Sequence, residues 1–162
     1  MNNNLNIVEY EPWHQPFFET LNKAWLERFG LEELDKYVLM NPDDAIIKKG
    51  GAILIAMYDD VVAGVVGLRK TGAREFEFTK MTVDEKYRRK GIAESLSKAA
   101  FEKARQLGAD RVILYSHSVL TPALNLYKKL GFKQIPLEQG TYARADIKME
   151  LRLEPMLSSG QP

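Results

Sequence analysis

The chain contains no cysteine among its 162 residues, which excludes disulfide bonds, thiolate metal ligands and a cysteine nucleophile. No stretch approaches the roughly 20 apolar residues of a membrane-spanning helix. The first residues, MNNNLNIVEYEP, lack the apolar run of a signal peptide. We therefore expect a cytoplasmic protein with no membrane partner.

The chain also has little net charge and few histidines. Its 23 basic and 22 acidic residues leave a formal charge of +1, so general attraction to nucleic acid is not predicted. The two histidines, His14 and His117, lie far apart in sequence, and we expect no metal site. Two familiar phosphate loops are also absent. There is no GxxxxGK[ST] pattern and no GxGxxG after the first predicted strand.

The positive charge that the chain does carry is concentrated in one loop. Four basic residues fall within Lys86 to Lys90 (KYRRK), and Gly91 follows at the start of a predicted helix. A helix N-terminus offers free backbone N–H groups and the positive end of the helix dipole. Glycine lets a ligand approach the backbone closely, and arginines add charge-assisted hydrogen bonds. The pattern predicts a phosphate or pyrophosphate site, with a solvated basic loop as the alternative.

Hydrophobic periodicity predicts one domain of mixed α and β structure. We expect this domain over residues 1–153, followed by a disordered tail at 154–162. Three consecutive strands should form an antiparallel meander, and the strand–helix–strand unit after them implies a locally parallel pair. The predicted helices are 16–29, 31–39, 43–49, 91–107 and 121–130, and the predicted strands are 6–10, 52–58, 61–68, 75–83, 111–115, 132–135 and 145–153.

Two motifs carry a family resemblance. The loop Arg88 to Ala93 (RRKGIA) fits R/Q-x-x-G-x-G/A, and Pro122 to Phe132 reads PALNLYKKLGF. In this order they resemble the GNAT acetyltransferase superfamily from about Leu5 to Leu153. The stretch WLERFGLEELDKY resembles the opening of many uncharacterised bacterial members. The resemblance implies the α/β (α+β) GNAT acyl-CoA acyltransferase fold, a mixed, mostly antiparallel twisted sheet of about six to seven strands flanked by helices.

The same resemblance implies an activity and a cosubstrate. An acetyl group should pass directly from acetyl-CoA to a primary amine of a small, amino-acid- or polyamine-like molecule, without a covalent enzyme intermediate. Family members often hold the pantetheine arm with an asparagine before the second motif. Here that loop has none, and Ser118 or His117 is the candidate replacement. The implied cofactor-binding residues are Met81, Thr82, Val83, Arg88, Arg89, Lys90, Gly91, Ile92, Ala93 and Ser118.

The resemblance also implies two catalytic residues and a main-chain donor. Glu77 is the candidate base that deprotonates the acceptor amine, with Glu75 as its nearest competitor. Tyr127 is the candidate acid for the leaving thiolate, because a phenol with a pKa of about 10 is protonated at neutral pH. The N–H of Val83 or Met81 should face the acyl carbonyl, where negative charge develops. Plain strand alternation places Glu77 on their face unless a bulge intervenes.

The acceptor should bind between the first helices and the last hairpin. The candidate substrate-binding residues are Trp25, Glu33, Tyr142 and Arg144. Carboxylates there suit an ammonium, and Arg144 suits a carboxylate.

Three other functions remain open from the sequence. A peptide or protein N-acetyltransferase would have the same fold with an open groove. A non-catalytic acyl-CoA-binding regulatory module would need neither Glu77 nor Tyr127. A nucleic-acid-binding domain is disfavoured by the small net charge. The family also admits a homodimer.

Overall fold

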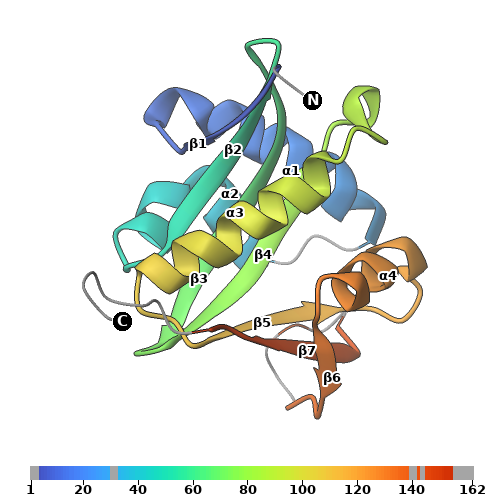
Figure 1. Cartoon of the computed structure of the whole chain (residues 1–162). Helices are drawn as coiled ribbons and strands as arrows, with labels where there is room; N and C mark the ends of the chain where they lie inside the picture. Colours follow the sequence, from blue (N-terminus) through green and yellow to red (C-terminus); the bar gives the residue numbers. More distant parts are fainter. Residues whose placement is uncertain (1–3, 30–32, 139–141, 143–144, 155–162) are drawn as a thin grey trace, which may run out of the picture.

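The computed structural model describes residues 4–29, 33–138, 142 and 145–154. Within this part of the chain one sheet runs through the molecule in the order β1-β2-β3-β4-β5-β7-β6 (Figure 1). Its strands are β1 (Leu5–Glu9), β2 (Ala52–Tyr58), β3 (Val61–Gly72), β4 (Glu75–Val83), β5 (Arg111–Ser116), β6 (Lys133–Ile135) and β7 (Ile147–Arg152). The helices are α1 (Gln15–Phe29), α2 (Glu33–Met40), α3 (Ile92–Gln106) and α4 (Thr121–Lys129), with short turns η1 (Pro12–His14), η2 (Asp43–Ile47) and η3 (Glu85–Tyr87).

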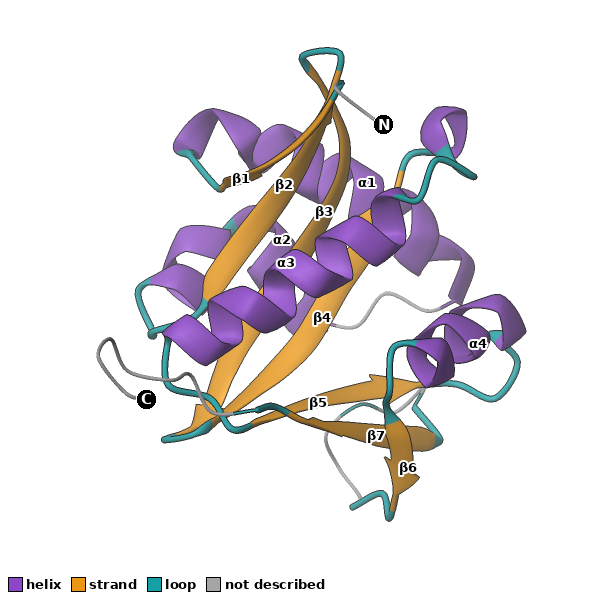
Figure 2. Ribbon diagram, viewed as in Figure 1, coloured by secondary structure: helices purple, strands orange, loops and turns teal. Residues whose placement is uncertain are grey.

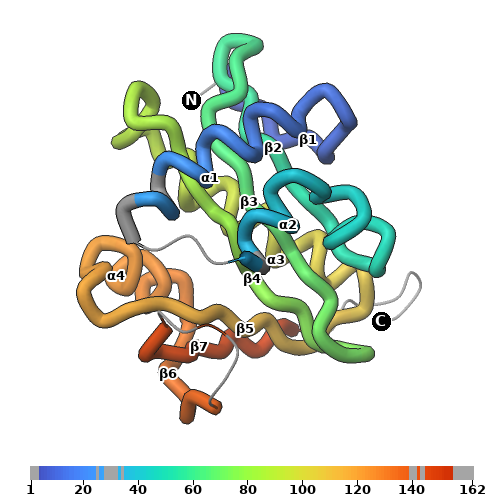
Figure 3. Tube along the Cα trace, turned by 180° about the vertical axis from the view of Figure 1, so that it is seen from behind, coloured from blue at the N-terminus to red at the C-terminus, as the bar shows by residue number. Residues whose placement is uncertain are grey.

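Helices cover both faces of the sheet. Helix α3 crosses one face of β2, β3 and β4 (Figure 2), and the opposite view shows α1 and α2 on the other face (Figure 3). Alternate residues of β2 divide between two apolar clusters: Leu54 packs on the α3 side, whereas Ile53 and Ile55 pack with α1 and α2. A strand buried on both faces needs a continuous apolar run, which explains the sequence AILIAMY.

The expected meander and crossover are both present. Strands β1 to β4 pair antiparallel in chain order, and β4 pairs with β5 in parallel after the α3 crossover. The turn between β2 and β3 is tight, since Asp59 and Asp60 both have positive φ, at 50° and 65°. The bounds of β2 and β4 are those predicted from the sequence.

One local prediction about helices is wrong, because the helix expected at 43–49 is a single π-helical turn, Asp43–Ile47. Helix α4 has Leu120 at its N-cap position, and Thr121 and Pro122 lie in its first turn. Proline at the start of a helix has a φ that already suits the helix. Its missing N–H costs nothing there, because the first N–H groups of a helix have no partner within it. Pro122 can therefore start this helix without a side-chain cap. No helix within the described residues is both long and apolar enough to span a membrane.

The sheet divides between β4 and β5. These strands pair over three residues only, from Glu75↔Arg111 to Glu77↔Ile113. Beyond that point β5 continues along β7 as far as Ser116, and β4 continues along β3 as far as Val83. The two strands diverge in a fork that is visible in Figure 2. Within the described part of the chain, the edge of β4 from Phe78 to Val83 therefore has no strand on its β5 side.

A β-bulge lies on the same edge of β4. Thr79 pairs with Gly67 and Thr82 with Val65, so Lys80 and Met81 together oppose one residue of β3. Lys80 has a φ of 57°, in the left-handed region that non-glycine residues seldom adopt. The extra residue reverses the alternation of the strand, as a bulge does.

This reversal corrects the expectation from plain alternation. Phe76 and Phe78 belong to the cluster on the α3 face, and Met81 and Val83 pack against that same cluster. Glu77 therefore lies on the opposite face from Met81 and Val83, on the side covered by α1 and α2.

Candidate active site

A cavity of about 600 Å³ opens at the fork between β4 and β5. Its described lining combines the β4 edge from Glu77 to Val83 with the end of β5, the loop after β5, helix α4, part of α1 and Tyr142. Because it passes through the fork, the cavity is reached by side chains from both faces of the sheet. Residues separated by the sheet elsewhere can meet here.

One end of the cavity lies at the basic loop and the start of α3. Arg89 and Gly91 have positive φ, at 65° and 74°, and Gly91 is the N-cap of α3. Among the described residues, none accepts a hydrogen bond from the backbone N–H groups of residues 89–94. A Cβ added at Gly91 would meet no atom within 4 Å. The loop thus offers free donors beside open space, and this fits a pyrophosphate group.

Three of the four basic side chains of the loop, those of Arg88, Arg89 and Lys90, differ in position. Arg88 lines the cavity. Arg89 and Lys90 are exposed, and the Lys90 ammonium lies 5.2 Å from the centre of the Tyr58 ring. Ala93 lines the cavity, but Ile92 is buried in the core, so only the backbone of Ile92 is available to a ligand.

Tyr127 projects from α4 into the lining of the cavity. Its ring packs edge-on against Phe78 and Phe132, at centroid distances of 6.1 and 5.8 Å. No described residue provides a hydrogen-bond partner for its hydroxyl. Burial raises the pKa of Tyr127 to about 12, because the phenolate would be poorly solvated. The Tyr127 phenol is therefore protonated at neutral pH, and its aromatic neighbours hold it in place.

Glu77 lies at the base of the fork and is 1% exposed. Its Oε1 accepts hydrogen bonds from Nε and Nη2 of the cross-strand residue Arg69, at 3.0 and 2.7 Å. Its Oε2 accepts one from the Tyr142 hydroxyl at 2.9 Å. Burial, followed by the charge of Glu77, raises the pKa of Tyr142. The carboxylate is thus oriented by Arg69 and Tyr142, and the Tyr142 phenol connects it to the cavity.

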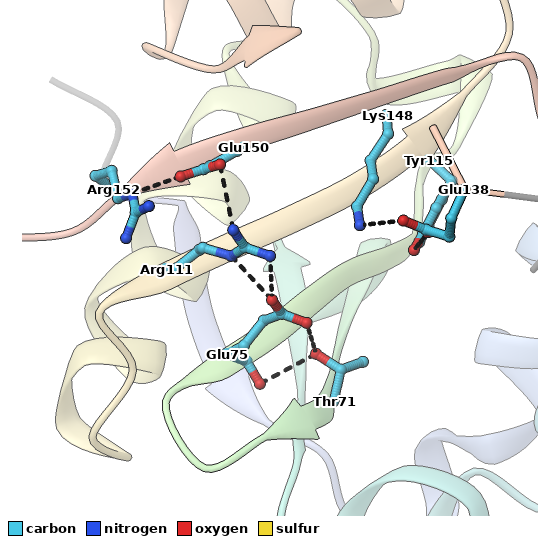
Figure 4. Close-up of polar contacts among 8 residues, drawn as sticks. All are labelled: Thr71, Glu75, Arg111, Tyr115, Glu138, Lys148, Glu150 and Arg152. Atoms are coloured by element: carbon cyan, nitrogen blue, oxygen red, sulfur yellow. Dashed lines mark hydrogen bonds and ion pairs between the residues drawn. The ribbon is translucent and has the colours of Figure 1, made fainter. Parts of the chain in front are cut away.

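Glu75, the competing candidate base, belongs to a different cluster (Figure 4). Its carboxylate accepts hydrogen bonds from Arg111, with the Nε contact at 2.9 Å, and from Thr71 Oγ1 at 2.8 Å. The hydrogen bonds to Thr71 and Arg111 lower its pKa. Glu75 is not among the described residues that line the cavity. Its position makes it a bridge between β4 and β5 below the fork.

A second cluster in Figure 4 holds the segment between β6 and β7. Glu138 accepts hydrogen bonds from Lys148 Nζ at 2.7 Å and from the Tyr115 hydroxyl. These bonds lower the pKa of Glu138 to about 2. The Tyr115 ring packs edge-on against Tyr142 at 5.4 Å, so the cluster also supports the tyrosine that contacts Glu77.

A buried ion pair beside the cavity was not predicted from the sequence. Lys80 Nζ lies 2.9 Å from Asp35 Oδ1, and the two side chains are 5% and 0% exposed. The Lys80 ammonium is also 5.7 Å from the centre of the Tyr142 ring. The pair joins α2 to the bulge of β4. Asn22 and Leu26 of α1 line the cavity as well.

The other predicted site residues fall in different places. Met81, Thr82 and Val83 line the cavity, and so does His117. Ser118 is exposed, and its hydroxyl donates to Asp146 at 2.8 Å, so its position gives no support to a pantetheine contact.

Glu33 is exposed and pairs with Lys36 at 3.1 Å. Arg144 and the side chain of Trp25 lie outside the described part of the chain. Within that part, no group of three histidines or carboxylates could hold a metal ion.

A sheet that forks over a cavity, a helix N-terminus with free N–H groups, and a tyrosine and a glutamate that line the cavity from the two sides of the fork fit a transferase site for an acyl-CoA. The comparisons with known proteins agree. Residues 9–132 match the acetyltransferase (GNAT) family. The chain therefore belongs to this family, which makes it an acyl-CoA-dependent N-acyltransferase with acetyl-CoA as cosubstrate, as the two motifs predicted.

Individual relatives and solved structures are consistent with this membership. The chain is 30% identical over 116 residues to an uncharacterised N-acetyltransferase, YvbK, of Bacillus subtilis, covering 70% of this chain and 75% of that protein. It is 30% identical over 111 residues to the N-acetylaspartate synthetase of Xenopus tropicalis, covering 67% of this chain and 38% of that protein.

Among solved structures, a GNAT-family acetyltransferase of Staphylococcus aureus superimposes with a TM-score of 0.82 at 19% identity, covering 93% of this chain and 99% of that one. YncA of Salmonella typhimurium, a structure with its cofactor acetyl-CoA, gives 0.74 at 18% identity, covering 96% and 98%. These likenesses confirm the fold.

Proposed function

We propose that this protein transfers an acetyl group directly from acetyl-CoA to a primary amine of a small molecule. The observation that carries the proposal is the lining of one cavity by both Tyr127 and Glu77, on opposite faces of the forked sheet. Helix α1 and Tyr142 contribute to the acceptor end, which favours a small molecule over a long peptide. The likeness to N-acetylaspartate synthetase, whose name denotes an acetylated amino acid, supports the same class of acceptor.

Acetyl-CoA binding is assigned to the basic loop and the unpaired edge of β4. The N–H groups of residues 89–94 hold the pyrophosphate, and Arg88 adds charge from within the cavity. The N–H of Val83 or Met81 stabilises the negative charge that develops on the acyl oxygen. Such a donor needs a strand edge without a partner, and β4 has one beyond Glu77.

Proton movements are assigned to two groups. An alkyl ammonium must lose a proton before it can attack. The Tyr142 oxygen can accept a hydrogen bond from the amine while its own hydrogen is donated to Glu77, so Glu77 receives the proton through Tyr142 or a water molecule. Tyr127 donates a proton to the departing thiolate from the other side of the fork. The absence of cysteine is consistent with transfer in one step.

The test begins with calorimetric titration of acetyl-CoA, with dephospho-CoA and ATP as controls. We expect saturable binding of acetyl-CoA that is clearly tighter than that of ATP and is abolished in Gly91→Trp. An amine panel that includes amino acids, polyamines and short peptides is then assayed by thiol release. Turnover confined to peptides would contradict the small-molecule assignment. A cytoplasmic location and a homodimer stay predictions from the sequence.

A further inference from the structure

We infer that the acceptor carries a carboxylate beside its reactive amine and that Lys80 binds this carboxylate. The substrate class is then amino acids and related amino carboxylates, and polyamines are excluded. The inference rests on the proposed function and makes its acceptor more specific.

The backbone places Lys80 at the acceptor end of the cavity. Lys80 is the residue at the β4 bulge, with φ at 57°, three residues after Glu77 on the unpaired edge. Bulges redirect a side chain out of the regular alternation of a strand and are common beside active sites. Lys80 lines the cavity, although its side chain is 5% exposed. A conformation seldom adopted by lysine thus brings an ammonium to the substrate side of the strand.

The charges of the lining favour an anionic group on the acceptor. Among the described residues that line the cavity, Glu77 is the one carboxylate, and Arg69 and Tyr142 already occupy both of its oxygens. A polyamine carries a second ammonium, which would meet no uncommitted carboxylate in this lining. The cationic lining residues are Lys80 and Arg88, and Arg88 lies at the pyrophosphate end. The remaining cation, Lys80, is therefore the residue suited to a carboxylate.

Lys80 has donor capacity left after its protein contacts. An ammonium carries three N–H donors. Asp35 takes one at 2.9 Å, and the Thr79 hydroxyl lies at the limit of hydrogen-bond distance, 3.5 Å. Asp35 thus holds the ammonium at a fixed place, and at least one donor is available to a ligand. Lysine binds carboxylates as a point charge, without the forked geometry of arginine.

One aromatic ring connects the two halves of the recognition site. The Tyr142 hydroxyl contacts Glu77 at 2.9 Å, and the Tyr142 ring centre is 5.7 Å from the Lys80 ammonium. An amine beside the hydroxyl and a carboxylate beside the ammonium can therefore belong to one small zwitterion that lies along Tyr142.

The test compares acceptors that differ only in their charge. Each amino acid of a panel is assayed beside its amide and its decarboxylated amine, and spermidine is included. We expect kcat/KM for the preferred amino acid to exceed that for its amide by about 30-fold or more, the loss typical when a buried charge loses its partner. In Lys80→Met the kcat/KM of the acid should fall by a similar factor, mainly through KM, and the ratio of acid to amide should approach one.

Two further variants keep the test decisive. Lys80→Met leaves Asp35 without its partner, so the double variant with Asp35→Asn is measured as well, and acetyl-CoA binding reports whether each protein is folded. Lys133→Met, an exposed lysine on β6, is the matched control and should leave the ratio unchanged.

The possible results separate the inference from the proposed function. Preference for spermidine or for uncharged amines would overturn the inference and leave the small-molecule activity standing. A loss in Lys80→Met that is equal for acid and amide would also overturn it, because a purely structural ion pair predicts that result. If acetyl-CoA binds and only peptides are acetylated, both are overturned.

Discussion

Replacing Tyr127 by phenylalanine should remove a proton donor and little else. The hydroxyl has no hydrogen-bond partner among the described residues, and the ring contacts with Phe78 and Phe132 do not involve it. The free energy of unfolding should therefore change by less than about 0.5 kcal/mol, as for substitutions that break no buried contact. The cavity gains the space of one oxygen atom, so acetyl-CoA should bind with an affinity within about threefold of the parent.

The effect on turnover follows from the chemistry of the leaving group. General acid catalysis contributes about 10²- to 10⁴-fold. A thiol with a pKa near 8.5 can leave as a thiolate with moderate ease, so it depends less on protonation by an acid. The lower end of the 10²- to 10⁴-fold range for general acid catalysis therefore applies to Tyr127. We expect kcat for Tyr127→Phe to fall about 100-fold, which corresponds to about 2.7 kcal/mol of transition-state stabilisation.

The assay is thiol release at saturating acetyl-CoA, measured from pH 6 to 10, with thermal unfolding and calorimetry on the same samples. The control is Tyr58→Phe, because Tyr58 contacts the basic loop through Lys90 and does not line the cavity. Since the pKa of Tyr127 is raised to about 12, wild-type activity should show no alkaline decline from this residue within that range. Unchanged kcat in Tyr127→Phe would refute the acid role, and so would a loss of affinity as large as the loss of turnover.

Three other predictions concern the base, the loop and the N-terminal turn. Glu77→Gln should lower kcat at least 100-fold while acetyl-CoA still binds, and an unchanged kcat would move the base elsewhere. Gly91→Ala forces alanine into the left-handed region, which should lower the free energy of unfolding by about 1–2 kcal/mol in a denaturant titration. The same change should weaken acetyl-CoA binding, and an unchanged affinity would place the pyrophosphate elsewhere. Burial lowers the pKa of His14, whose Nδ1 accepts a hydrogen bond from the Glu11 N–H at 2.8 Å. Stability should therefore fall as pH drops below about 6.5, where the unfolded chain binds the proton more readily, and His14→Phe should show a shallower loss of melting temperature between pH 7 and 5.

The strands and the basic loop could be predicted because each is specified by its own residues. The continuous apolar run from Ala52 to Tyr58 and the basic residues before Gly91 carry their signals locally. The sequence of β4 also contains a signal of its bulge. In EFEFTKMTV the apolar residues lie at even positions up to Phe78 and at odd positions from Met81, with two polar residues between. A shift of parity inside one strand predicts one extra residue at that point.

The partners of the site residues could not be predicted in the same way. Arg69 meets Glu77 because of the register between β3 and β4, which has two shifts along its length. Asp35 reaches Lys80 because α2 packs across the sheet, a contact between residues 45 positions apart in sequence. Such contacts depend on how whole elements dock, and no local pattern specifies that docking.

The fork has a consequence for the order of events during turnover. Tyr127 packs with the cluster on the α3 face, and Glu77 lies on the face of α1 and α2. In the mechanism that we propose, acetyl-CoA and the amine therefore approach the cavity from opposite sides of the sheet, and neither blocks the path of the other. The direct transfer that we propose requires both to be bound together, and the chain has no cysteine that could carry the acetyl group between them. Initial-rate plots against the two substrates should give intersecting lines, and spent CoA can leave while the acetylated amine is still bound.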